Sequence, residues 1–175
     1  MSELQDNRQE PRFVRRDEFE VVGIEGRTSQ KSNRIPELWD AFGPREDDIP
    51  HREDLDVSYG LCFLDDGQEP GMTAEDVEFT ALVGVEVSEV GELPEGMVSK
   101  KIPAGEYAVF THKGAFFPDG LPNTYKYIYR EWFRASQYKP AANYNFEHYN
   151  HYSFHGVNHP STMIEIWVPV KYASR

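Results

Sequence analysis

The chain has 175 residues, a formal net charge of −12 and an apolar content of 39%. This composition is typical of a globular domain, and the acidic balance argues against a nucleic-acid-binding surface, which needs a basic stripe. Cys62 is the only cysteine, so no internal disulfide can form, and no apolar run approaches the roughly 18 residues of a membrane span. We therefore expect one cytoplasmic domain with no cofactor and no direct nucleic-acid or membrane partner.

Residues 1–17 are polar and charged, with few apolar side chains. We expect a flexible N-terminal arm that is dispensable for folding and for ligand binding, because it has too little apolar surface to dock. Arg12, Arg15 and Arg16 cluster in this arm, but the acidic residues around them favour a solvated tail over a nucleic-acid arm.

The first half of the remaining chain predicts a strand, a helix and two further strands. Residues 19–28 contain several β-branched side chains, which favour a strand. Residues 35–42 carry the apolar stripe of a helix, with spacings i, i+3, i+4 and i+7, at Ile35, Leu38, Trp39 and Phe42. Residues 57–64 and 77–87 alternate between apolar and polar side chains, as half-buried strands do.

The same order of elements begins again near residue 97. A strand is predicted within residues 99–112, and Asn123 is the predicted N-cap of a second helix. The stripe of this helix repeats the spacing of the first, at Tyr125, Ile128, Tyr129 and Trp132. Strands at 144–152 and 164–170 complete the set. Matching elements lie 84 to 90 positions apart, by subtracting Phe79 from Met163 and Ile35 from Tyr125, which indicates a duplicated unit.

The sequence therefore predicts an α+β fold in which residues 18–172 form one domain, with pseudo-repeats at about 18–90 and 97–172. Two strand–helix–strand–strand units can join into one curved antiparallel sheet with both helices on the same face. Alternation directs Ile164, Ile166 and Val168 toward the helices and Trp167 away from them. The junction between the two halves is a usual place for a ligand cleft.

Glu147 lies in an aromatic-rich strand predicted from residue 143. Side chains alternate along a strand, so Asn145, Glu147 and Tyr149 share one face, and Phe146 and His148 take the other. If the Glu147 face is shielded from water, the bare charge is costly unless it is paired. A small organic cation, held by charge and by ring faces, would pair with it. The alternative is a strand at the sheet edge whose Glu147 points into solvent.

Three other features have both a structural and a functional interpretation. Four histidines crowd into one segment beside Glu147, at His148, His151, His155 and His159. The glycine and proline among them favour a loop, so we expect no metal site. Cys62 is expected to be a small buried apolar residue and not a nucleophile. The second helical stripe either packs the core or carries at least one ring that touches a pocket, because Tyr and Trp keep a polar group.

Five stretches carry a family resemblance: Ile-Pro-Glu-Leu-Trp-Asp-Ala-Phe at 35–42, Ile-Pro-Ala-Gly-Glu-Tyr-Ala-Val-Phe at 102–110, Tyr-Ile-Tyr-Arg-Glu-Trp at 127–132, Phe-Glu-His-Tyr at 146–149 and Ile-Trp-Val-Pro-Val-Lys at 166–171. In order and spacing they resemble the GyrI-like small-molecule-binding family, which also forms the effector-binding domain of AraC-type and MerR-type multidrug regulators. The resemblance covers residues 19–171. It implies an aromatic pocket between the halves, with Glu147 at its base and Trp132 on its wall. The sequence contains no helix-turn-helix region, so it is similar to the stand-alone members.

We expect a binding module that senses or sequesters an amphipathic, cationic and aromatic compound. Glu147 supplies the charge, and the candidate walls are Tyr149, Trp132, Tyr107 and Trp167. The resemblance leaves two alternatives open, because some stand-alone relatives inhibit gyrase and others hydrolyse strained electrophiles. In a hydrolase, Glu147 with a raised pKa would steer or deprotonate water. A gyrase inhibitor would offer its acidic surface to a basic protein partner.

Overall fold

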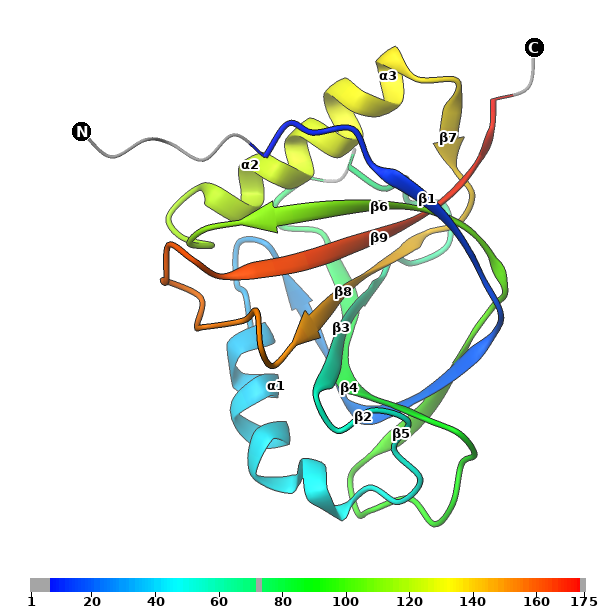
Figure 1. The fold of residues 1–175 in the computed structure, drawn as a ribbon, viewed down its shortest axis with the longest axis vertical. Coiled ribbons are helices and arrows are strands. Elements are labelled where there is room, and N and C mark those ends of the chain that lie inside the picture. The colour runs from blue at the N-terminus through cyan, green and yellow to red at the C-terminus, as the bar shows by residue number, and fades with distance from the viewer. Residues whose placement is uncertain (1–6, 72–73, 174–175) are drawn as a thin grey trace.

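The computed structural model describes residues 7–71 and 74–173. A curved antiparallel sheet of nine strands dominates these residues, and the helices pack against one of its faces (Figure 1). The strands are β1 (Arg12–Arg16), β2 (Phe19–Ser29), β3 (Val57–Phe63), β4 (Glu78–Val87), β5 (Val98–Ile102), β6 (Gly105–Lys113), β7 (Tyr138–Pro140), β8 (Tyr144–Asn150) and β9 (Met163–Tyr172).

The helices form over the two predicted stripes. They are α1 (Ile35–Phe42), the 3-10 segment η1 (Gly43–Asp48), α2 (Gly120–Lys126), the π-helical segment η2 (Tyr127–Trp132) and α3 (Phe133–Ala135). The last three run on without a break. The predicted N-cap at Asn123 is wrong, because α2 begins at Gly120 and the Asn123 N–H already donates to the Asp119 carbonyl. No helix within the described ranges is long and apolar enough to cross a membrane.

The strand order confirms the duplicated unit. It runs β1-β6-β9-β8-β3-β4-β2-β5, with β7 beside β9. The order is symmetric about the contact between β8 and β3, so β2-α1-β3-β4 and β6-α2-β8-β9 are the two units, both within one antiparallel sheet. The edge strands are exchanged between the units. β1 precedes the first unit but pairs with β6, and β5 precedes the second unit but pairs with β2.

The N-terminal arm differs from the expectation. Residues 12–16 form β1, which pairs with β6 from Arg12 opposite Val109 to Arg16 opposite Gly105, so the prediction of a flexible arm is wrong for them. Backbone hydrogen bonds hold this edge strand, its Phe13 ring stacks on Tyr138 with centroids 4.8 Å apart, and Val14 packs against the core. The Arg16 guanidinium also lies 3.6 Å from the Phe19 ring centroid, where a cation and a ring attract. The first six residues of the predicted arm lie outside the described ranges.

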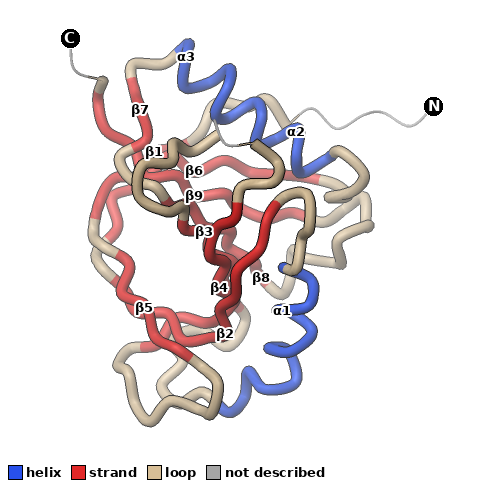
Figure 2. The backbone as a smooth tube through the Cα atoms, turned by 180° about the vertical axis from the view of Figure 1, so that it is seen from behind, coloured by secondary structure: helices blue, strands red, loops and turns tan. Residues whose placement is uncertain are grey.

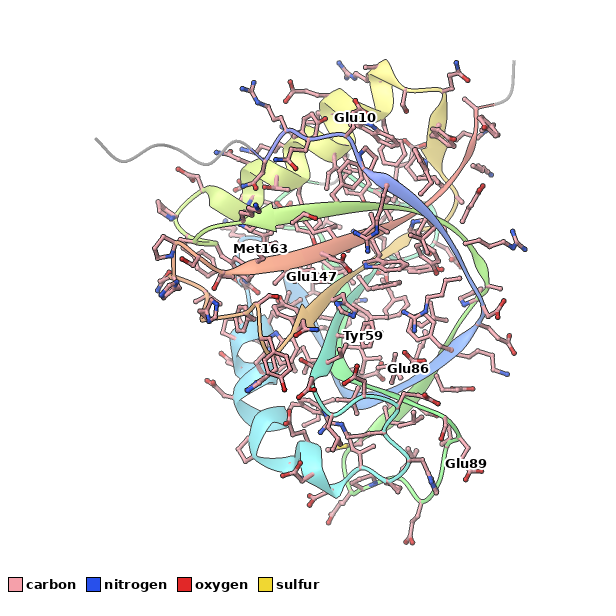
Figure 3. All side chains as sticks on the ribbon, viewed as in Figure 1. Glu10, Tyr59, Glu86, Glu89, Glu147 and Met163 are labelled. Carbon is pink, nitrogen blue, oxygen red and sulfur yellow. The ribbon has the colours of Figure 1, made fainter. Side chains whose placement is uncertain are left out.

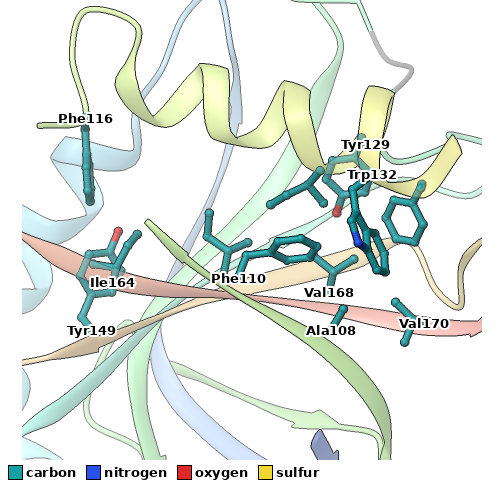
Figure 4. Packing of buried hydrophobic residues seen from close by; sticks show 12 residues of the cluster. Ala108, Phe110, Phe116, Tyr129, Trp132, Tyr149, Ile164, Val168 and Val170 are labelled. Atoms are coloured by element: carbon teal, nitrogen blue, oxygen red, sulfur yellow. The ribbon is translucent and has the colours of Figure 1, made fainter. Parts of the chain in front are cut away.

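Both faces of the sheet are buried. On the helix side the buried cluster comprises Ala108, Phe110, Phe116, Ile128, Tyr129, Trp132, Phe133, Tyr149, Ile164, Ile166, Val168 and Val170 (Figure 4). On the other side the sheet curls on itself (Figure 2), and a second cluster includes Phe19, Tyr59, Tyr107, Phe146 and Trp167. The predicted alternation along β9 is therefore confirmed, since Ile166 and Val168 face the helices and Trp167 faces the other way.

Candidate functional site

Glu147 lies in β8 at the contact between the two units, directly opposite Gly60 of β3 (Figure 3). β8 is an interior strand between β9 and β3, so the interpretation of Glu147 as a residue at a sheet edge is wrong. Asn145, Glu147 and Tyr149 all lie on the helix side, and Phe146 lies in the core of the opposite face. The predicted division of this strand into two faces is confirmed.

Two tyrosine hydroxyls hold the Glu147 carboxylate. The Tyr125 hydroxyl donates to Oε2 and the Tyr149 hydroxyl donates to Oε1, each at 2.5 Å. Burial raises the pKa of Glu147, while the two hydrogen bonds act in the opposite direction. Burial, followed by the nearby Glu147 charge, raises the pKa of both tyrosines well above the usual value. Both phenols therefore stay protonated and act as donors.

A small space lies beside the carboxylate because β3 has a glycine at position 60. A Cβ built on Gly60 would lie 3.5 Å from ring atoms of Trp39 and Tyr149 and 3.7 Å from Glu147 Oε1. These are ordinary van der Waals distances, so a methyl group would fit there without displacing its neighbours. The Trp39 and Tyr149 rings meet edge to face with centroids 5.1 Å apart. Aromatic rings from α1, α2 and β8 thus border the carboxylate.

Two tyrosines of the second helical region reach two residues on the same face of β8. Tyr125 binds Glu147, and the Tyr129 hydroxyl accepts a hydrogen bond of 2.9 Å from Asn145 Nδ2. Four residues along a helix rise about 6 Å and two residues along a strand about 6.6 Å, so the two contacts fall in register. Tyr125 and Tyr129 therefore border the Glu147 site in addition to packing the core.

Trp132, a predicted wall residue, lies away from the carboxylate. It is buried in the helix-side cluster, where its ring packs edge to face on Phe110 with centroids 5.2 Å apart. Its Nε1 donates to Glu10 Oε2 at 3.2 Å. Figure 4 shows Trp132 above Val170, at the opposite end of the cluster from Tyr149.

Tyr107 and Trp167, the other two predicted walls, lie on the opposite face of the sheet from Glu147. Their ring centroids are 5.6 Å apart within the second cluster. Of the predicted walls, Tyr149 reaches the carboxylate, and the structure does not bring Tyr107 or Trp167 to it. Sequence reasoning assigned no role to Trp39, although its place in the first helical stripe matches that of Tyr129 in the second, 90 positions later.

The histidines of the 148–159 segment separate in space. His148 lies on the face opposite Glu147, with Nδ1 3.7 Å from a Glu165 oxygen, and burial lowers its pKa. His155 and His159 lie against each other in the loop between β8 and β9, with ring centroids 5.3 Å apart. Across residues 7–71 and 74–173, no three or more His, Cys, Asp and Glu side chains are placed to hold a metal ion.

Cys62 lies directly opposite Asn145 in the β3–β8 register, two residues along β3 from Gly60. Burial, followed by the Glu147 charge, raises the pKa of the Cys62 thiol. The thiol therefore stays protonated and is a poor nucleophile. Its side chain is small, so it takes up little space beside Asn145 on the helix side of the sheet.

The chain matches one protein family over most of its length. Residues 12–170 match the family described as Cass2, integron-associated effector binding protein. The transcriptional regulator BrlR of Pseudomonas aeruginosa is 36% identical over 159 residues, which are 91% of this chain and 54% of BrlR. The chain thus spans about half the length of that regulator.

Two solved structures share the fold. SAV2435, in a structure with bound tetraphenylphosphonium, has a TM-score of 0.69 and 18% identity, over 93% of this chain and 94% of that one. The C-terminal domain of EcmrR has a TM-score of 0.66 and 18% identity, over 93% of this chain and 97% of that one. The predicted resemblance to GyrI-like effector-binding domains is confirmed, and the chain belongs to the Cass2 family of integron-associated effector-binding proteins.

Proposed function

We propose that this protein binds amphipathic organic cations at Glu147 and that it senses or sequesters them. The observation that carries the proposal is a carboxylate with two hydroxyl donors and no cationic partner. In the described part of the chain, Tyr125 and Tyr149 hold the Glu147 oxygens, and no Lys, Arg or His pairs with them. A buried negative charge of this kind is costly, and a ligand cation would compensate it.

The site keeps the capacity to accept such a ligand. Each carboxylate oxygen has two acceptor positions, and the tyrosines use one on each. Each oxygen can therefore accept a further hydrogen bond or pair with a cation while both hydroxyls stay bound. Glycine at position 60 leaves room for a group of methyl size beside Oε1, next to the rings of Trp39 and Tyr149. Ring faces attract cations, so the same rings would hold both the charge and the apolar part of a ligand.

Two further observations support an organic cation. The net charge of −12 gives the protein a field that attracts positive ligands from solution. The SAV2435 structure, which shares the fold, holds tetraphenylphosphonium, a cation with aromatic arms. BrlR is named as a transcriptional regulator and EcmrR has been solved in a complex with DNA, in keeping with a sensing role for this type of domain.

Thermal unfolding with tetraphenylphosphonium and with neutral triphenylphosphine oxide tests the proposal. A ligand at a hundred times its Kd should raise Tm by about 5 °C or more, and the neutral compound should have a much smaller effect. Mass spectrometry of the recovered compounds, and of an added epoxide, is the second measurement. Intact compounds support binding, whereas a hydrolysed epoxide would support the hydrolase alternative. No shift with tetraphenylphosphonium or other aromatic cations would contradict the proposal.

A further inference from the structure

The Glu147 site contains an unsatisfied hydrogen-bond acceptor. Asn145 Oδ1 is buried and has no hydrogen-bond partner among the described residues, whereas Nδ2 of the same amide donates to the Tyr129 hydroxyl. A buried acceptor without a partner is rare in folded proteins and destabilises the fold. An acceptor of this kind inside a candidate ligand site is well placed to be satisfied by the ligand.

The unsatisfied carbonyl lies beside the carboxylate. Asn145 and Glu147 are two residues apart on the same face of β8, so their Cα atoms are separated by about 6.6 Å. The β3 residues opposite them are Cys62 and Gly60, both small. With small residues opposite both positions, a single ligand bound at Glu147 would also lie within reach of Asn145.

The amide is held in place from the helix side. A Cβ built on Gly71 would lie 2.2 Å from Tyr129 Cβ, so the backbone at Gly71 packs directly against Tyr129 and fixes its position. Gly71 also has a φ of 76°, a conformation that other residues rarely adopt. Burial raises the pKa of Tyr129, so its hydroxyl stays neutral. Tyr129 holds the amide through Nδ2, and the carbonyl oxygen, which has no partner among the described residues, can accept a hydrogen bond from a ligand.

We propose that Asn145 determines specificity in the Glu147 site by accepting a hydrogen bond from the ligand. This inference rests on the proposed function, because it assumes that a cation binds at Glu147. The preferred ligands are then organic cations that carry N–H donors, such as protonated amines, amidiniums and guanidiniums. These cations can pair with Glu147 and donate to Asn145 Oδ1. Quaternary ammonium and phosphonium ions satisfy the charge but leave the carbonyl unpaired.

Two matched probes test this inference, 4-phenylbenzylammonium and its N,N,N-trimethyl derivative. They share the aromatic arm and the charge, but only the first carries N–H donors. Calorimetric titration into the parent protein and into Asn145→Leu should show that the substitution weakens binding of the primary ammonium about tenfold, as expected for one lost hydrogen bond. Binding of the trimethyl probe should change less than about twofold, because it makes no such bond.

The same titrations separate this inference from the proposed function. Glu147→Gln should weaken both probes, because both carry the charge. If Asn145→Leu weakens both probes equally, or neither, the specificity role is refuted while cation binding at Glu147 stands. If neither probe binds the parent protein, the proposed function and the inference fall together. Circular dichroism melting of each variant checks folding, and Asn145→Ala replaces Asn145→Leu if leucine does not fit.

Discussion

Two glutamates on opposite faces of the same sheet receive tyrosine hydroxyls but differ in their counterion (Figure 3). Glu86 of β4 accepts a hydrogen bond of 3.2 Å from the Tyr59 hydroxyl and pairs with the Arg16 guanidinium at 2.5 Å. Glu147 accepts hydrogen bonds from two tyrosines, and no cation within the described ranges pairs with it. Among the described residues, Arg16 thus pairs with Glu86, whereas Glu147 receives neutral hydroxyl donors alone.

Under the proposed function, this difference separates a carboxylate that stabilises the fold, Glu86, from one that binds a ligand, Glu147. Arg16 comes from β1, so its pairing with Glu86 ties the N-terminal edge strand to β4. Burial raises the pKa of Tyr59 to about 12, which keeps its hydroxyl available as a donor in this group. Glu147 forms no ion pair with a residue of the described ranges, and the neutral hydroxyls of Tyr125 and Tyr149 compensate its charge only in part. We expect mutations of Arg16 or Glu86 to affect folding. Mutations of Glu147 should affect binding.

The largest expected effect comes from breaking the internal ion pair. Arg16→Ala removes the cation from Glu86 and the contact with the Phe19 ring, so the free energy of unfolding should fall by about 2–3 kcal/mol. This is below the value for a fully buried pair because the Arg16 and Glu86 side chains are 19% and 24% exposed. Urea denaturation measures the change. Arg15→Ala, an exposed neighbour in β1, is the control, and an equal loss in both variants would contradict the structural role of Arg16.

The dependence of stability on pH should show whether folding raises or lowers the pKa of Glu147. Burial raises its pKa in the folded protein, so the folded state binds this proton more tightly than the unfolded chain. The contribution of Glu147 to stability is therefore greatest below the ordinary carboxyl pKa of about 4.3 and is lost as the pH rises through the raised value. Glu147→Gln should become progressively more stable than the parent across this range in urea denaturation. A constant difference would show that folding does not shift the pKa of Glu147, and a difference of opposite sign would show that the two tyrosine hydrogen bonds outweigh burial; either result contradicts a costly buried charge.

A smaller effect is expected from filling the space at position 60. Gly60→Ala places a methyl group 3.5 Å from Trp39 and Tyr149, which is an ordinary van der Waals distance. Stability should be unchanged or higher by about 0.4–1 kcal/mol, because alanine restricts the unfolded chain. Cation affinity should fall a few-fold, since the ligand loses room beside Oε1. Gly23→Ala is the contrasting variant, because its Cβ would lie 1.9 Å from the Val83 carbonyl oxygen and should destabilise the fold. Unchanged affinity in Gly60→Ala would place the ligand elsewhere.

Local periodicity predicted most of the fold. The stripe from Ile35 to Phe42 became α1, and alternation along β8 and β9 placed Glu147 and Trp167 on the correct faces. β1 was not predicted, because residues 12–16 have no apolar pattern and their strand depends on backbone pairing with β6. The exchange of edge strands between units was also not predictable, because pairing partners are set by tertiary structure.

The site was predicted less completely than the fold. Glu147 and Tyr149 lie on one strand, where alternation alone relates them. Trp39 and Tyr125 come from two helices, and their approach to Glu147 depends on how these helices cross the sheet. The choice of Trp167 as a wall conflicted with the alternation that directed it away from the helices.

The most direct test of the central claim is calorimetric titration of tetraphenylphosphonium into the parent, Glu147→Gln and Glu165→Gln. Glu165 lies on the opposite face and binds Arg12 and Trp167, so its variant makes the same change of charge away from the site. Glu147→Gln should weaken binding about tenfold or more, because the lost partner is a full charge in contact with the cation. Glu165→Gln should stay within about twofold of the parent, since Glu165 lies on the other face of the sheet and already pairs with Arg12. Equal weakening in the two variants would show that Glu147 acts only through the overall charge, and would contradict a cation site at this carboxylate.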